Sequence, residues 1–108
     1  KEAQAERRKD EITTGDQTEI ISAIKEQIIK PQLSHPATAK FPGALGWSIL
    51  NVTAGVTTFS SYVDSQNALG GTVRTNFVVT ACKKDGKIHF VDVVINGQEL
   101  FNDMSPCV

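Results

Sequence analysis

The sequence predicts an α+β fold, in which one N-terminal amphipathic helix packs on a four-stranded antiparallel meander. The chain has 108 residues, which is enough for one hydrophobic core and too few for two. Isoleucines recur at helical spacing in its first third, and four segments rich in β-branched residues follow, separated by short turn sequences. We therefore expect a charged stalk over residues 1–15 and a single α+β domain over residues 16–108.

The composition limits the classes of partner. Hydrophobic residues make up 40% of the chain and charged residues 21%, which is typical of a folded domain. The formal net charge is −1, so nucleic acid is not an expected partner. No apolar run reaches the roughly 20 residues that cross a bilayer, so no transmembrane segment is predicted. Because the chain begins at Lys1, we expect further sequence upstream, where a signal or an anchor could lie.

The first 15 residues hold eight charged side chains and one large aliphatic residue, Ile12. Such a segment buries too little apolar surface to offset the cost of ordering it. Its composition is typical of a solvated stalk that separates a domain from an anchor. A flexible terminus explains the same composition equally well.

A helix is predicted over residues 17–30. Asp16 and Glu19 have the spacing of a capping box at its start, and Pro31 cannot donate to the helical ladder, so it ends the run. The apolar stripe that should face the sheet repeats every four residues, at Ile20, Ile24 and Ile28.

Prolines and glycines over residues 31–46 predict an irregular crossover, which leads into four strands. The expected strands cover residues 47–53, 56–65, 72–83 and 87–95. Asp85-Gly86 and Asn96-Gly97 are the dipeptides that type I′ hairpin turns favour, and short connections predict antiparallel neighbours. For the C-terminal tail we expect a short helix or an edge segment.

The third and fourth predicted strands are apolar on both faces, with Phe77, Val78 and Val79 in sequence on one of them. A single helix covers only one face of a sheet, so the other face must meet the tail, the crossover or a second copy. This pattern predicts a protein partner or self-association through an apolar sheet face. Coverage by the tail and the crossover is the alternative.

Two motifs resemble those of a known group of proteins. Residues 33–41 (LSHPATAKF) resemble an L-x-x-P-x-(S/T)-A-x-F pattern after an amphipathic helix, and residues 62–71 (YVDSQNALGG), with Arg74 and Phe77, resemble a strand–turn–strand of the type V-x-(A/S)-x-N-x-(F/L)-G. Together they are similar to small α+β modules at the C-terminal end of secreted or lipid-anchored bacterial and phage-encoded proteins. The resemblance implies an extracellular or cell-envelope location and a helix-plus-sheet layout, but no activity. Ser61 departs from the pattern, because a glycine is usual there.

Cys82 and Cys107 admit two readings. In a cytosolic protein they would be unrelated thiols, and in an exported one a disulfide is expected. A bond between them would close a loop of about 25 residues, worth about 3–4 kcal/mol in the chain-entropy model. With the exported location that the resemblance implies, we predict the disulfide.

No catalytic, cofactor or metal site is predicted. Cys82 and His89 flank one hairpin, but a mid-strand thiol has no cleft or oxyanion pocket around it. His35, His89 and the two cysteines lack paired metal-ligand spacing, and no phosphate-binding loop precedes a helix. We therefore expect no enzyme and no cofactor.

The helix-plus-meander layout is also similar to that of cystatin-type inhibitors of thiol proteases, whose first hairpin loop carries Q-x-V-x-G. Here Gln66 and Gly70 match, Ala68 replaces the valine, and the loop comes one strand later. A cystatin-like inhibitor is thus the alternative to a non-enzymatic extracellular or envelope module that binds protein.

The surface predicted to contact a partner lies around the hairpin over residues 66–71. It consists of polar and aromatic side chains on both flanking strands, namely Tyr62, Asp64, Gln66, Asn67 and Arg74. The competing interpretation is that Asp64 and Arg74 only form a cross-strand or diagonal ion pair.

Overall fold

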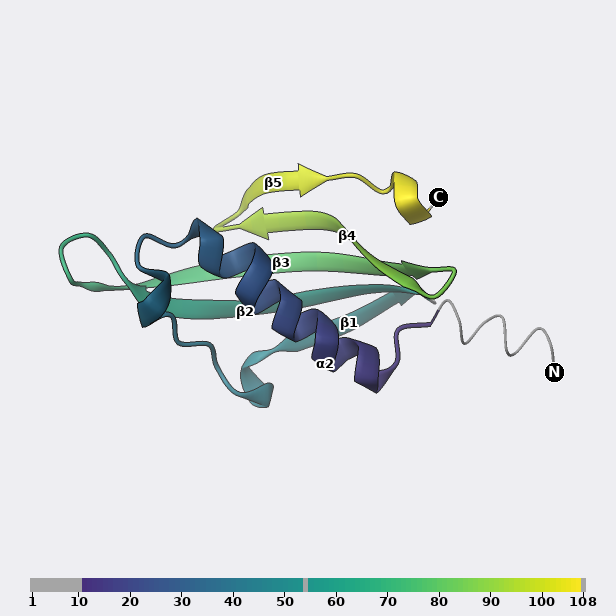
Figure 1. The fold of residues 1–108 in the computed structure, drawn as a ribbon, viewed down its shortest axis with the longest axis horizontal. Coiled ribbons are helices and arrows are strands. Elements are labelled where there is room, and N and C mark those ends of the chain that lie inside the picture. The colour runs from purple at the N-terminus through teal and green to yellow at the C-terminus, as the bar shows by residue number, and fades with distance from the viewer. Residues whose placement is uncertain (1–10, 54, 108) are drawn as a thin grey trace.

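The structure is a computed structural model that describes residues 11–53 and 55–107, with one helical segment packed on a five-stranded antiparallel sheet (Figure 1). Helix α2 covers Thr14–Ala23 and continues through a π-helical turn (Ile24–Ile29) into a 3-10 turn (Lys30–Gln32). The strands follow one another in space as they do in sequence: β1 (Ser48–Thr53), β2 (Val56–Gln66), β3 (Thr72–Lys84), β4 (Lys87–Ile95) and β5 (Gln98–Asn102). The predicted α+β class is confirmed, with five strands rather than four.

The helix begins one turn before the predicted position. Thr13 is the N-cap: its Oγ1 accepts a hydrogen bond from the Asp16 backbone N–H (3.1 Å), and Asp16 Oδ2 accepts one from the Thr13 N–H (2.9 Å). The predicted capping box between Asp16 and Glu19 is therefore wrong. Asp16 closes the box instead of opening it, because the threonine hydroxyl and the carboxylate satisfy each other's orphan N–H groups.

The apolar stripe changes register within the helix. Ile20, Ile24 and Ile29 are buried, whereas Ile28 is only half-buried, so the predicted i+8 member of the stripe is wrong by one residue. The reason is the π-helical turn, in which the Lys30 N–H donates to the Lys25 carbonyl five residues back. A wider turn delays the return to the same face by about one residue.

The core lies between this stripe and one face of the sheet. Side chains that alternate along the central strands meet the isoleucines there, and the largest of them are Phe59, Val63, Phe77 and Val79. Trp47 and Phe41 pack edge-on against the Phe77 ring, with ring centroids 5.4 and 6.2 Å away. The crossover therefore contributes to the core beside the helix.

The hairpin turns agree with the sequence. Asp85 and Asn96 have positive φ angles of 53° and 51°, and the glycines after them have φ of 77° and 79°. Two successive positive φ values define the type I′ turn that twists with its strands. Both turns are confirmed, and the second leads into β5, the edge segment expected in the tail.

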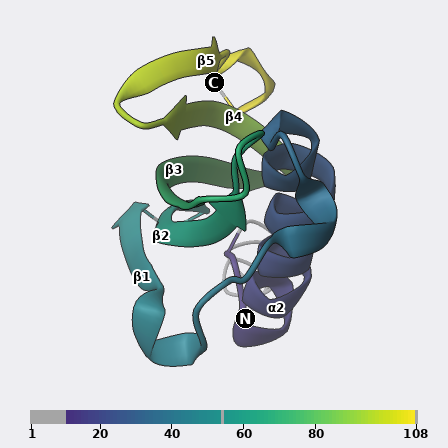
Figure 2. The same cartoon turned by 90° about the vertical axis from the view of Figure 1, so that its left-hand side faces the viewer.

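The face of the sheet opposite the helix is covered only in part, over β3 and β4. Figure 2 shows the strands nearly end-on, with the helix along a single face. On the other face the C-terminal 3-10 turn (Ser105–Cys107) packs on β3 and β4, and the Asp103 N–H donates to the Val91 carbonyl (2.8 Å). Toward β1 this face keeps Leu50, Val52 and Val78 exposed. The tail thus covers part of the face, and the crossover lies beside its edge.

Among the described residues, no helix combines the length and the apolar character that crossing a bilayer requires.

Candidate functional site

Three of the predicted surface residues lie together on the helix-free face of β2 and β3. Asp64 and Arg74 are direct cross-strand partners. The guanidinium of Arg74 donates from Nε to Asp64 Oδ1 (2.8 Å) and from Nη2 to Oδ2 (3.0 Å), and it lies 3.9 Å from the centre of the Tyr62 ring. These hydrogen bonds hold the pKa of Asp64 below its ordinary value. The predicted ion pair is confirmed, and it fixes a planar cation on an aromatic ring.

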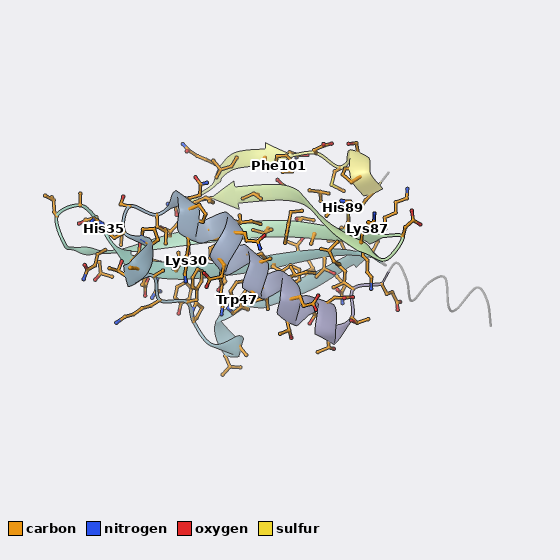
Figure 3. The ribbon with its side chains drawn as sticks, viewed as in Figure 1. Lys30, His35, Trp47, Lys87, His89 and Phe101 are labelled. Atoms are coloured by element: carbon orange, nitrogen blue, oxygen red, sulfur yellow. A yellow bond between two sulfur atoms is a disulfide. The ribbon has the colours of Figure 1, made fainter. Side chains whose placement is uncertain are left out.

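Gln66 and Asn67 have a different role, because they shape the loop between β2 and β3. The Gln66 N–H donates to Thr38 Oγ1 (2.9 Å), and His35 Nδ1 lies 3.2 Å from the Gln66 carbonyl oxygen. Figure 3 shows His35 beside this loop. Both partners come from the crossover, which therefore supports the base of the loop.

Asn67 closes the loop on itself. Its Oδ1 accepts hydrogen bonds from the N–H groups of Leu69 (3.0 Å) and Gly71 (2.9 Å), and its own N–H donates to the Gly71 carbonyl (2.8 Å). Gly70 supplies the positive φ (84°) that the return requires. These bonds hold the backbone of the loop in a closed turn.

Leu69 was not among the predicted site residues, and it is the side chain that this loop presents. Its exposed fraction is 96%, although leucine is normally at least partly buried. A signal was present in the sequence, because one large aliphatic residue stands between turn-forming residues at positions 66–71.

A hollow of about 430 Å³ lies beside the base of the loop. Its lining comes from the crossover and from both strands of the hairpin: Thr38, Lys40, Asp64, Ser65, Gln66 and Thr72. The backbones of Lys40 and Asp64 bond to each other in both directions (2.8 and 3.0 Å), which joins the crossover to the edge of β2. The loop, the ion pair and this hollow form one continuous surface, which we call the loop surface.

Cys82 and His89, the residues considered for thiol chemistry, do not form a thiol site. Cys82 is buried on β3 and is bonded to Cys107, so it presents no thiolate. His89 on β4 is its direct cross-strand neighbour. Within residues 11–53 and 55–107, no three His, Cys, Asp or Glu side chains gather in a way that could hold a metal ion.

A pair of carboxyl groups on β4 and β5 was also missed. Burial and a hydrogen bond with Glu99 raise the pKa of Asp92, while a hydrogen bond from Asn102 Nδ2 to Glu99 Oε1 (2.7 Å) helps to lower the pKa of Glu99. Asp92 Oδ1 is buried and has no hydrogen-bond partner in the described part of the chain. Asp92 and Glu99 lie seven positions apart, so only the pairing of β4 with β5 brings them together.

In comparisons with protein-family models, curated proteins and solved structures, none matches this chain significantly. The fold and the loop surface therefore carry the functional argument alone.

Proposed function

We propose that this chain is a non-enzymatic protein-interaction module of the cell envelope or the extracellular space, which binds a protein partner through its loop surface. The observation that carries the proposal is Leu69, an aliphatic side chain 96% exposed at the tip of a loop that Asn67 holds in one conformation. An apolar anchor on a rigid support binds without the cost of ordering a flexible loop.

The polar groups around Leu69 suit a protein surface. Arg74 and Tyr62 are of the types enriched in interfaces, and they are already stacked on each other. A partner would meet an apolar tip first and then a polar rim with Lys40 beside it. This arrangement of apolar centre and polar surround is common in specific complexes.

The position of the loop also supports this role. In Figure 1 the described chain begins at the end of the sheet where β3 turns into β4, and the C-terminal turn lies at that end too. The β2–β3 loop projects from the opposite end. A module held by its charged N-terminal stalk would thus present Leu69 away from its attachment.

Export is supported by the disulfide. Structural disulfides persist in oxidising compartments and are rare in the cytosol. The bond between Cys82 and Cys107 is therefore consistent with an extracellular or envelope location, lipid-anchored or free.

Site-specific photo-cross-linking in the producing cell tests the loop surface. Leu69 is replaced by benzoylphenylalanine, and the matched control carries the same residue at Leu100, an exposed leucine on β5. We expect a discrete cross-linked protein from position 69 that position 100 does not give, and Leu69→Asp should abolish its co-purification. Equal cross-linking at both positions would contradict the proposal.

The inhibitor alternative rests on Gln66, on Gly70 and on a loop that projects freely from the sheet. Papain assayed with micromolar protein tests it. Loss of papain activity would support a cystatin-like role, and full residual activity would exclude that role while leaving the loop surface untouched.

A further inference from the structure

Strand β1 is an open edge of the sheet. It pairs with β2 on one side, and no described residue pairs with its other side (Figure 2). All six of its residues are exposed, including Ile49 (37%), Leu50 (63%) and Val52 (57%). Unpaired N–H and C=O groups along such an edge can template another strand.

Natural proteins guard open edges with charge or proline, and β1 has neither. Residues 43–63 contain no charged residue and no proline. The opposite edge is different, because β5 carries Glu99 and Asp103 follows it directly. Pairing two copies of β5 would bring like charges together, whereas pairing two copies of β1 would not.

We propose that β1 pairs with β1 of a second copy of this chain, antiparallel about a two-fold axis, to form one continuous ten-stranded sheet from two five-stranded halves. The proposal goes beyond the loop surface, because it uses another part of the molecule. It leaves Leu69 free in both copies.

The register follows from symmetry. A two-fold axis perpendicular to a sheet maps each face onto itself. Two residues that lie opposite each other across the contact must therefore be separated by an even number of positions in the sequence. The axis then passes between one residue and its own copy. An axis through Leu50 places Leu50 against its own copy and Ile49 against Asn51 of the second copy. These three residues lie where the β1–β2 ladder is regular, before its irregularity between Asn51 and Thr53.

Symmetry also explains why a second copy is preferred to an unrelated strand. The isologous contact consumes both open edges and leaves only the charged β5 edges outside, so assembly stops at two copies. On the helix-free face, the contact buries the most exposed of the large hydrophobic side chains of β1, Leu50, against an identical apolar group. A pair of six-residue strands buries well below the ~1,200 Å² of a standard interface, so we expect dissociation at tens of micromolar or above.

Sedimentation equilibrium from about 10 μM to 1 mM tests the dimer. We expect wild type to shift from monomer to dimer over this range, Leu50→Lys to stay monomeric, and Leu100→Lys, the matched change on the other edge, to behave as wild type. A wild type that stays monomeric throughout, or a Leu50→Lys variant that dimerises as wild type does, would overturn the proposal.

Cysteine cross-linking keeps the test decisive if the lysine variant folds poorly. Under mild oxidation Leu50→Cys should yield a covalent dimer on non-reducing gels at least tenfold faster than Leu100→Cys. Equal rates would mean random collision and would count against the β1 contact. Leu69→Asp should dimerise like wild type, which separates failure of this inference from failure of the loop surface.

Discussion

At the scale of single residues, the least satisfied group in the described structure is the Asp92 carboxyl. The residue of β3 that lies opposite Asp92 is Thr80. The Thr80 hydroxyl, however, is within hydrogen-bond distance of the Thr58 hydroxyl (3.1 Å). Asp92 instead shares a hydrogen bond with a second acidic group, Glu99. Two carboxyl groups can bond only if one is protonated, so the pair resists full ionisation.

The raised pKa of Asp92 predicts a pH-dependent cost. A carboxyl whose pKa is higher in the folded than in the unfolded state stabilises the fold below its unfolded pKa, and that stability is lost as the pH rises through the folded value. Wild type therefore carries a penalty at neutral pH. Asp92→Asn should raise the free energy of unfolding by about 1 kcal/mol at pH 7, and the gain should disappear near pH 3.

Urea titrations at both pH values measure this effect. Asp103→Asn is the control of opposite sign, because hydrogen bonds from the Ser105 hydroxyl and N–H lower the pKa of Asp103, so its charged form is the favoured one. The Asp103→Asn variant should have a lower free energy of unfolding than wild type at pH 7, whereas Asp92→Asn should have a higher one. If Asp92→Asn is neutral or destabilising at pH 7, the carboxyl pair does not carry the cost described.

At the scale of elements, the capping box joins the helix to the sheet. Asp16 accepts the Thr13 N–H and also the Lys83 ammonium of β3 (2.8 Å). These bonds, the one from Lys83 first, lower the pKa of Asp16. Its contribution to stability is therefore present at neutral pH and is lost as the pH falls through its folded pKa.

Removal of the cap should weaken the fold. Thr13→Ala deletes the hydroxyl that accepts the Asp16 N–H and should cost about 1 kcal/mol of unfolding free energy. Thr14→Ala, at the exposed first helical position, is the matched control and should change stability by less than about 0.5 kcal/mol. Equal losses in the two variants, measured by urea unfolding, would show that the cap is not the source.

The elements differ in how much the sequence revealed. Asp85-Gly86 and Asn96-Gly97 could be placed because only a few residue types tolerate two positive φ angles in succession. The start of the helix could not be placed from the sequence, because Asp16 closes a capping box with Thr13 and also has the spacing that would open a second capping box with Glu19. The π-helical turn that buries Ile29 leaves no mark in the spacing, since adjacent isoleucines at 28 and 29 fit either register.

At the scale of the whole molecule, the disulfide attaches the C-terminal tail to the face that the helix leaves open. Cys82 lies on β3 beside Ala81, but on the opposite face, because side chains alternate along a strand. Cys107 reaches it from the C-terminal 3-10 turn, which packs on β3 and β4. The bond thus determines how much of that face stays open.

Loss of the disulfide should be among the most costly changes outside the core. The bonded residues are 25 positions apart, so the double variant Cys82→Ala with Cys107→Ala should lose about 3–4 kcal/mol of unfolding free energy. Wild type should lose a similar amount in reducing agent, and the double variant should not respond to it. A wild type with unchanged stability after verified reduction would argue against a structural role.

The whole-molecule layout was predictable in part. Alternating apolar residues and short turns define the meander, but β5 has five exposed residues and no alternation of burial to reveal it. Of the residues predicted to contact a partner, Gln66 and Asn67 support the β2–β3 loop, and the exposed side chain at its tip is Leu69. Neither the pairing of Asp92 with Glu99 nor the extent of tail coverage can be read without strand register.

The described chain begins at the end of the sheet opposite the β2–β3 loop, and this placement has a mechanical consequence. A pull between the start of the described chain and the β2–β3 loop would run along the strands (Figure 1). The helix would have to slide over the sheet, and β1 along β2, with many contacts sharing the load at once. Such shear geometry resists force better than opening the ladder one bond at a time.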